Sequence, residues 1–126
     1  MKVLIGGSRN WVDYNHIVRK MTILLEDWVR NNPEDKRIIF IHSASTPAEN
    51  MVTEYIGKVD KLLKQKGYHI DEKIVKNNKP ISENIFTSSN LDIDKAIFFI
   101  RDSCKKTQSI ANISSAIGIP TEIVKG

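Results

Sequence analysis

Short apolar runs alternate along the chain with longer stretches in which apolar residues recur every three or four positions. The short runs predict strands, and the longer stretches predict helices that bury one face. Five strands are expected, at 3–5, 38–41, 68–75, 96–100 and 121–124. The run at 38–41 is apolar on both faces, as in buried parallel strands, whereas 68–75 alternates and predicts an edge strand.

The helical spacing predicts four helices, at 14–30, 47–66, 82–91 and 107–117. The first would bury Ile17, Met21, Leu24, Leu25 and Trp28, and the second Met51, Val52, Tyr55, Ile56, Val59, Leu62 and Leu63. Gly67 stands where a glycine usually ends a helix. The polar residues 76–80 are expected to form a loop.

This order of elements predicts a single α/β domain over residues 1–126. The expected architecture is a three-layer Rossmann-like parallel sheet of about five strands with helices on both faces. Ligands of such folds bind outside the carboxyl ends of the strands, where the strand order reverses. Three loops are expected to meet there, at 6–11, 42–46 and 101–106.

Composition narrows the classes of partner and the location. The net charge is +4, and the basic residues are mixed with acidic ones, so nucleic acid is not expected as a partner. The single cysteine, Cys104, excludes an intrachain disulfide and favours a reducing compartment. The N-terminal apolar run is too short for a signal peptide or a membrane helix, so a cytoplasmic location is expected. The three histidines lie on different predicted elements, and neither a metal nor a cofactor is expected.

The first loop is the main candidate for an anion site and reads Gly6-Gly7-Ser8-Arg9-Asn10-Trp11. Glycines allow the backbone to approach a ligand closely, and the free amides of a following helix attract anions. The Arg9 guanidinium and the Ser8 hydroxyl suit phosphate or carboxylate. Trp11 would either stack on a base or cap the core.

The second loop runs from His42 to Glu49. Thr46 and Glu49 have the spacing of a capping box, which is a sufficient reason for the glutamate. A catalytic or ribose-binding carboxylate is the alternative interpretation. Ser43 and Ser45 offer hydroxyls to a phosphate or ribose, and His42 is either a hydrogen-bonded structural residue or an acid–base group.

The third loop is basic, with positive charge from Arg101, Lys105 and Lys106. This charge would lie beside a helix that Thr107 is expected to cap, and such an arrangement favours anions unless the loop is simply solvated. Asp102 would oppose a bound phosphate unless it pairs with Arg9 or Arg101. Cys104 has no histidine or aspartate at motif spacing, so no nucleophilic role is assigned to it.

With these loops located, the chain resembles the YspA-like branch of the SLOG superfamily. These are Rossmann-like proteins related to the Lonely Guy phosphoribohydrolases, to DprA and to the nucleotide-sensing domain of Thoeris effectors. Residues 2–11 are similar to the family's strand followed by G-S-R-[DN]-W. Further family motifs correspond to residues 42–49 (H-G-G-A-x-G-A-D), Glu83-Asn84 (R-N), 102–107 (G-G-x-G-T) and 114–121 (A-x-x-x-G-I-P-V).

The residues and the resemblance together imply one SLOG-like nucleotide-binding domain. Its ligand site would comprise Gly6, Gly7, Ser8, Arg9, Trp11, Ser43, Ala44, Ser45, Thr46, Glu49, Asn84, Arg101, Ser103, Lys105 and Thr107. Ser43, Ala44 and Pro47 stand where the family's second loop has glycines, and no carboxylate follows Thr107 where Lonely Guy enzymes carry a glutamate. These departures favour a receptor or sequestering protein without a catalytic residue.

We therefore expect non-catalytic binding of a nucleotide-derived small molecule, such as an ADP-ribose derivative or a cyclic nucleotide. By analogy, a phage protein in the host cytoplasm would use such a domain to sequester a defence nucleotide. One alternative is a nucleotide N-glycosidase or phosphoribohydrolase in which Glu49 stabilises the reacting centre or activates water. A second alternative is an interaction module without a ligand. A homodimer or higher oligomer is expected.

Overall fold

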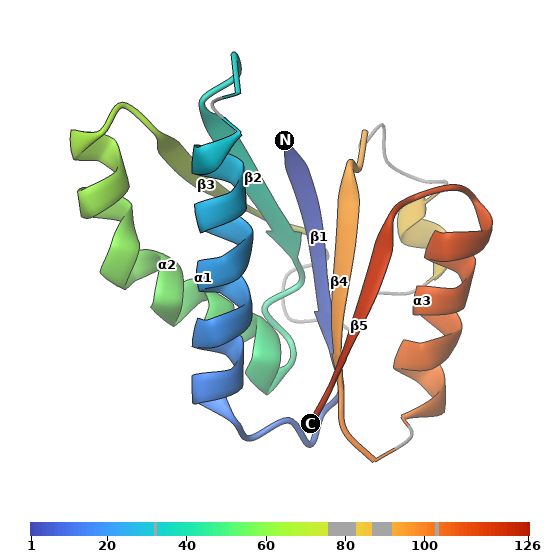
Figure 1. Cartoon of the computed structure of the whole chain (residues 1–126). Coiled ribbons are helices and arrows are strands. Elements are labelled where there is room, and N and C mark those ends of the chain that lie inside the picture. Colours follow the sequence, from blue (N-terminus) through green and yellow to red (C-terminus); the bar gives the residue numbers. More distant parts are fainter. Residues whose placement is uncertain (32, 76–82, 87–91, 103) are drawn as a thin grey trace.

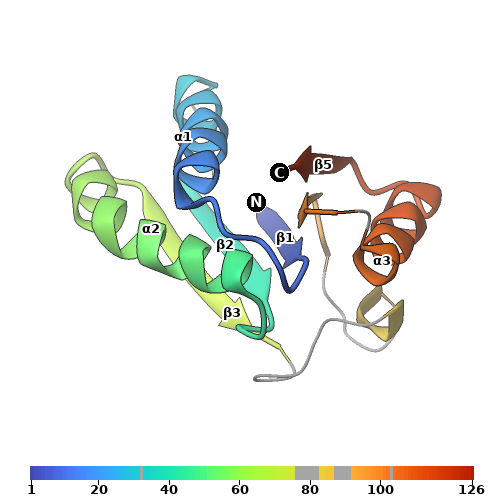
Figure 2. The same ribbon diagram turned by 90° about the horizontal axis from the view of Figure 1, so that it is seen from below.

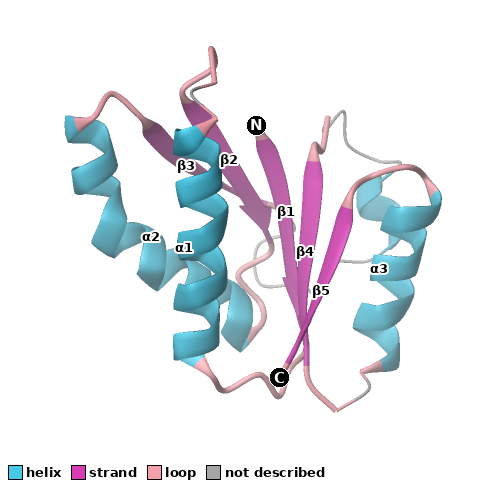
Figure 3. Cartoon of the chain, viewed as in Figure 1, coloured by secondary structure: helices cyan, strands magenta, loops and turns pink. Residues whose placement is uncertain are grey.

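The computed structural model describes residues 1–31, 33–75, 83–86, 92–102 and 104–126. In chain order its elements are β1 (Lys2–Gly7), α1 (Tyr14–Arg30), β2 (Arg37–His42), α2 (Pro47–Gln65), β3 (His69–Ile74), the 3-10 helix η1 (Glu83–Phe86), β4 (Lys95–Ile100), α3 (Lys105–Ala116) and β5 (Thr121–Lys125). The five strands form one parallel sheet in the order β3-β2-β1-β4-β5 (Figure 1, Figure 3).

Helices cover both faces of the sheet, so the expected three-layer Rossmann-like architecture is confirmed. Helices α1 and α2 pack on one face, and α3 with η1 packs on the other (Figure 2). Successive strand residues point alternately into two hydrophobic cores, one on each face of the sheet. Val3, Ile5 and Phe40 belong to the core under α1 and α2, whereas Leu4, Ile41 and Phe98 belong to the core under α3. The strands β1, β2 and β4 are therefore apolar on both faces. The alternating strand β3 lies at the sheet edge, as predicted.

The first two helices begin where the sequence predicts. The side chain of Asp13 caps α1 by accepting from the backbone N–H of His16, and all five expected residues of its apolar face are buried. Helix α2 has Thr46 at its N-cap, and Gly67 follows it with φ of +86°. The prediction that Leu62 faces inward is wrong, because its side chain is 56% exposed and its neighbour Leu63 takes the core position.

The third helix differs from the expectation at its start. It begins at Lys105, with Cys104 in the N-cap position, so Thr107 lies inside the first turn and does not cap the helix. This start places two lysines, Lys105 and Lys106, in the first turn of α3. Of the helix expected at 82–91, the described part is the 3-10 turn η1. The loop expected at 76–80 lies outside the described residues.

Candidate functional site

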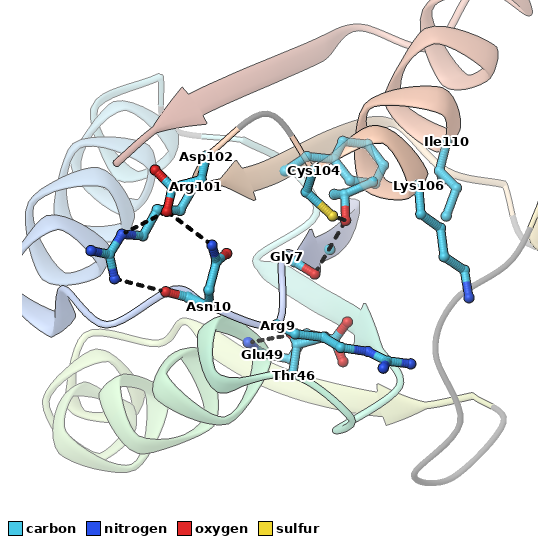
Figure 4. A pocket seen from close by; sticks show the side chains of 13 residues that line it. Gly7, Arg9, Asn10, Thr46, Glu49, Arg101, Asp102, Cys104, Lys106 and Ile110 are labelled. Carbon is cyan, nitrogen blue, oxygen red and sulfur yellow. Dashed lines mark hydrogen bonds and ion pairs between the residues drawn. The ribbon is translucent and has the colours of Figure 1, made fainter.

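The strand order reverses between β1 and β4, because the chain leaves β1 toward α1 on one face and leaves β4 toward α3 on the other. A crevice at such a point is the usual ligand site of an open parallel sheet. A pocket of about 350 Å³ lies there (Figure 4). It is lined by Gly6, Gly7, Arg9, Asn10, Thr46, Glu49, Phe98, Arg101, Asp102, Cys104, Lys106, Thr107 and Ile110.

The pocket has one apolar wall and one polar wall. Phe98 of β4 and Ile110 of α3 form the apolar part. Arg9, from the loop after β1, and Lys106, from the first turn of α3, extend into the same open side of the pocket in Figure 4. Both side chains are exposed, and among the described residues neither has a carboxylate within ion-pair distance. The open side of the pocket is therefore positively charged.

A second arginine is held differently. The Arg101 guanidinium donates to the backbone oxygen of Asn10 at 3.1 Å, and its Nε lies 3.7 Å from Oδ2 of Asp102. The side-chain amide of Asn10 also donates to Asp102, at 3.1 Å. Asp102 thus pairs with Arg101, and this network ties the loop after β1 to the loop after β4 (Figure 4). Arg101 consequently presents less free charge to the pocket than Arg9 does.

Glu49 forms the wall of the pocket on the α2 side, and its side chain is 1% exposed. Its Oε2 accepts three hydrogen bonds, from the backbone N–H and the hydroxyl of Ser43 and from the backbone N–H of Ser45, at 3.1, 2.7 and 3.0 Å. Half of the expected capping box is present, because the backbone N–H of Glu49 donates to Oγ1 of Thr46 at 3.4 Å. The carboxylate reaches past the N-cap residue to the loop before it, so its main contact is with that loop.

The two glycines of the first loop are required by packing within the protein. A Cβ atom on Gly6 would lie 2.6 Å from the Phe98 ring, and one on Gly7 would lie 2.6 Å from Cβ of Ala48. Both distances are shorter than real Cβ contacts. The sequence predicts that these glycines allow close approach of a ligand. The structure gives a second reason for them, because β1 packs closely against Phe98 and α2.

The start of α3 presents a thiol and backbone N–H groups to the pocket. Cys104, in the N-cap position, makes no side-chain capping hydrogen bond. The Thr107 hydroxyl, 3.3 Å from Sγ, is the main cause that lowers the pKa of the Cys104 thiol below its ordinary value. The nearby N–H groups of Thr107 and Lys106 and the charge of Arg9 lower this pKa further. These groups would favour any negative charge at this position.

Seven of the residues expected at the site line the pocket: Gly6, Gly7, Arg9, Thr46, Glu49, Arg101 and Thr107. The others that the structure describes are placed elsewhere. Ser43, Ala44 and Ser45 form the loop that Glu49 holds, and Lys105 points to a neighbouring surface groove. The backbone of Asn84 belongs to η1, its side chain is not described, and Ser103 lies outside the described residues.

Two expected contacts with a ligand are replaced by contacts within the fold. The Ser8 side chain is 1% exposed, and its hydroxyl accepts from the backbone N–H of Arg101 at 3.0 Å. Trp11 is also 1% exposed, packs edge-on against Phe99 and donates from its indole nitrogen to the backbone oxygen of Asp13. Of the two roles left open for Trp11, the structure assigns the one in the core. Neither residue lines the pocket.

Six pocket residues lie outside the ligand site predicted from the sequence: Asn10, Phe98, Asp102, Cys104, Lys106 and Ile110. The positive charge of Lys106 was noted in the third loop, but the residue was not assigned to the site. A signal existed for Phe98, because it pairs in register with Gly6 of β1 and a glycine beside a large aromatic residue indicates close approach. Asn10 lies in the first candidate loop, at the [DN] position of its motif, whereas Ile110 carries no comparable pattern in the sequence.

Comparison of the chain with protein-family models, with curated proteins and with solved structures found no match. Among the described residues, no group of three or more histidine, cysteine, aspartate or glutamate side chains is placed to hold a metal ion. No helix in the described part of the chain is both long and apolar enough to cross a bilayer. The fold and the pocket define an α/β domain with a cationic crevice at the point where the strand order reverses.

Proposed function

We propose that the chain binds a small phosphate-bearing ligand derived from a nucleotide and does not transform it. The observation that carries this proposal is the pair of unneutralised cations, Arg9 and Lys106, at the mouth of a pocket into which the uncapped start of α3 also opens. Cationic side chains and free helix amides together make a site for phosphate.

The remaining lining residues support a ligand with a ring as well as a phosphate. Phe98 and Ile110 provide an apolar surface for a planar or sugar ring. Glu49 and Thr46 lie on the opposite wall, where oxygen atoms suit ligand hydroxyls. A nucleotide fragment combines these three chemical features.

Binding is favoured over catalysis by the state of the two pocket carboxylates. Oε2 of Glu49 already accepts three hydrogen bonds, and Asp102 is held by Asn10 and Arg101. Both carboxylates thus already have partners within the protein, which favours a role in shaping the pocket. We further propose, from the resemblance to SLOG proteins, that the chain is an oligomeric cytoplasmic receptor or sequestering protein, such as a phage protein acting on a defence nucleotide.

Calorimetry with ADP-ribose, cyclic ADP-ribose isomers, cyclic dinucleotides and adenosine monophosphate tests the proposal. At least one of them should bind, and Arg9→Ala and Lys106→Ala should each weaken it by about tenfold or more, since a hydrogen bond to a charged group contributes about 1.5–3 kcal/mol. Matched controls are Arg30→Ala and Lys61→Ala, which remove the same charges from exposed positions on α1 and α2. Binding to none of these ligands, or equal losses in the controls, would contradict the proposal.

The second candidate is cleavage of an N-glycosidic bond, and the buried position of Glu49 in the pocket wall is the observation that favours it. In that case Glu49 would stabilise positive charge at the reacting sugar carbon. Chromatography of nucleoside monophosphates after incubation would detect the free base. Turnover that is abolished in Glu49→Gln would establish this activity in place of simple binding.

A further inference from the structure

A polar cluster lies between the sheet and α2, directly behind the loop that forms the Glu49 wall. His42 is the last residue of β2, and its side chain is fully buried. Its Nε2 is 2.7 Å from Oε2 of Glu72 on β3 and 3.2 Å from Oγ1 of Thr53 on α2. Thr53 donates to the same Glu72 oxygen, at 2.7 Å. The cluster therefore joins three elements beside the candidate site.

The other ring nitrogen settles which form of the imidazole the fold accommodates. The backbone N–H of Ala44 donates to Nδ1 of His42 at 3.0 Å, so this nitrogen carries no proton. The proton of the neutral ring is then on Nε2, where it is donated to Glu72. The hydrogen bond from His42 is also the main cause that lowers the pKa of the Glu72 carboxyl.

The bond to Ala44 supports a strained backbone. Ala44 has φ of +56°, a left-handed conformation that is unfavourable for a residue with a Cβ. Its neighbours Ser43 and Ser45 donate their backbone N–H groups to Oε2 of Glu49. His42 thus holds the centre of the loop from behind, while Glu49 holds both of its flanks from the pocket side.

We propose that His42 is a positioning residue for the pocket wall, and that its neutral Nε2–H form keeps residues 43–45 in the conformation that orients Glu49 toward a ligand. A second proton on the ring would place a donor, Nδ1–H, against the Ala44 N–H donor. The two groups repel each other, so the loop must move away and Glu49 loses its partners. Protonation of one buried histidine is thereby coupled to the shape of the site.

The groups that surround His42 determine which part of the structure moves when the ring gains a second proton. From β3 the ring faces Glu72, whose Oε2 lies 2.7 Å from Nε2 and accepts its proton in either form of the ring. From α2 it faces Thr53, and the nearest carboxylate of that helix, Glu49, acts through Ser43 and Ser45. The last register pair of β1 with β2 joins Leu4 to Ile41, so the next residue of β1 beside His42 is the uncharged Ile5. The loop is therefore the part that yields.

Nuclear magnetic resonance of the free, 15N-labelled protein tests the inference without any ligand. At pH 8 long-range 1H–15N spectra should show the Nε2–H tautomer of His42. On acidification the amide signals of Ser43, Ala44 and Ser45 should shift together with the ring 15N signals of His42. An Nδ1–H tautomer at pH 8, or loop amides that ignore the ring's ionisation, would overturn it.

Two substitutions distinguish a positioning role of His42 from a role in packing alone. In His42→Asn the side-chain oxygen takes the place of Nδ1 and accepts the Ala44 N–H at every pH, so the loop amides should keep their pH 8 positions down to pH 5. The control His69→Asn changes an exposed histidine of β3 and should leave the wild-type response intact. A pH response that persists in His42→Asn and disappears in His69→Asn would refute the assignment.

The effect on affinity rests on the proposed function and is measured separately. ADP-ribose is the probe, because its phosphodiester-like groups keep their charge between pH 8 and pH 5.5. The Cys104 thiol ionises in the pocket of both proteins, so the comparison is between them: from pH 8 to pH 5.5 the wild type should lose at least threefold more affinity than His42→Asn does. No binding at either pH would contradict ADP-ribose as ligand and leave the spectroscopic result to decide on His42, and the same change of affinity in the wild type and in His42→Asn would overturn the coupling.

Discussion

Arg9 and Lys106 determine the charge of the pocket, because the other nearby arginine already has partners. Arg101 is held by Asn10 and Asp102, so its loss would disturb the loops as well as a ligand. Arg9 and Lys106 are exposed and make no ion pair with any residue that the structure describes, so substitutions there report on binding more directly. Single residues thus divide into those that shape the site and those that are free to contact a ligand.

Cys104 allows the electrostatics of the site to be measured without knowledge of the ligand. The Thr107 hydroxyl is the main cause of the lowered pKa of its thiol, so Thr107→Val should raise this pKa and reduce the thiolate fraction at pH 7.5. We expect iodoacetamide to alkylate Cys104 several-fold more slowly in this variant. Thr22→Val, which removes a hydroxyl bound to Tyr55 on the far helices, is the control and should react at the wild-type rate. Equal rates in Thr107→Val and the wild type would contradict the assigned cause.

At the scale of elements, the site depends on how closely β1 approaches α2 and β4. The close approach leaves no space for a Cβ atom on Gly7, whereas Gly57, in the middle of α2, has nothing within 4 Å of the corresponding position. The two glycines therefore occur for different reasons. Gly7 allows packing, and Gly57 merely lowers the stability of an exposed helix surface.

Alanine at these two positions should change stability in opposite directions. Gly7→Ala forces β1 and α2 apart and should lower the free energy of unfolding by about 1–3 kcal/mol. Gly57→Ala should raise it by about 0.5–1 kcal/mol, because alanine is the better helix former. Urea denaturation of both variants measures the two changes. A stabilised Gly7→Ala protein would show that the space beside Ala48 is larger than the packing requires.

Strong periodicity made some elements predictable and its absence hid others. Helix α1 has apolar residues at regular spacing and a clear cap, and its predicted bounds are those of the structure. Helix α3 begins with Lys105 and Lys106, which carry no apolar signal, so its start was placed too late, at Thr107. Leu62 and Leu63 are adjacent leucines, and the pattern alone did not show that only one of them is buried.

The location of the site was more predictable than its composition. Three loops were expected at the strand reversal on topological grounds, and each contributes to the pocket or to its wall. The sequence did not indicate which polar groups the fold would use itself. Ser8 and Trp11 have suitable chemistry for a ligand, yet the Ser8 hydroxyl bonds to Arg101 and the Trp11 ring packs on Phe99. These partners become adjacent only when β1 meets β4.

For the whole molecule, the parallel order β3-β2-β1-β4-β5 brings together at one edge groups that are distant in sequence. The loop after β1, the start of α2 and the start of α3 each contribute one kind of group: a guanidinium, a buried carboxylate, and amides with a lysine. The central claim is that these groups form a site for a phosphate.

A titration of the 15N-labelled protein with pyrophosphate tests this claim most directly, since every nucleotide-derived ligand shares phosphate chemistry. We predict saturable amide shifts concentrated at residues 6–10 and at Lys105, Lys106 and Thr107, and their loss in Arg9→Ala but not in Arg30→Ala. Shifts that do not saturate, that lie away from the strand reversal, or that persist unchanged in Arg9→Ala would contradict it.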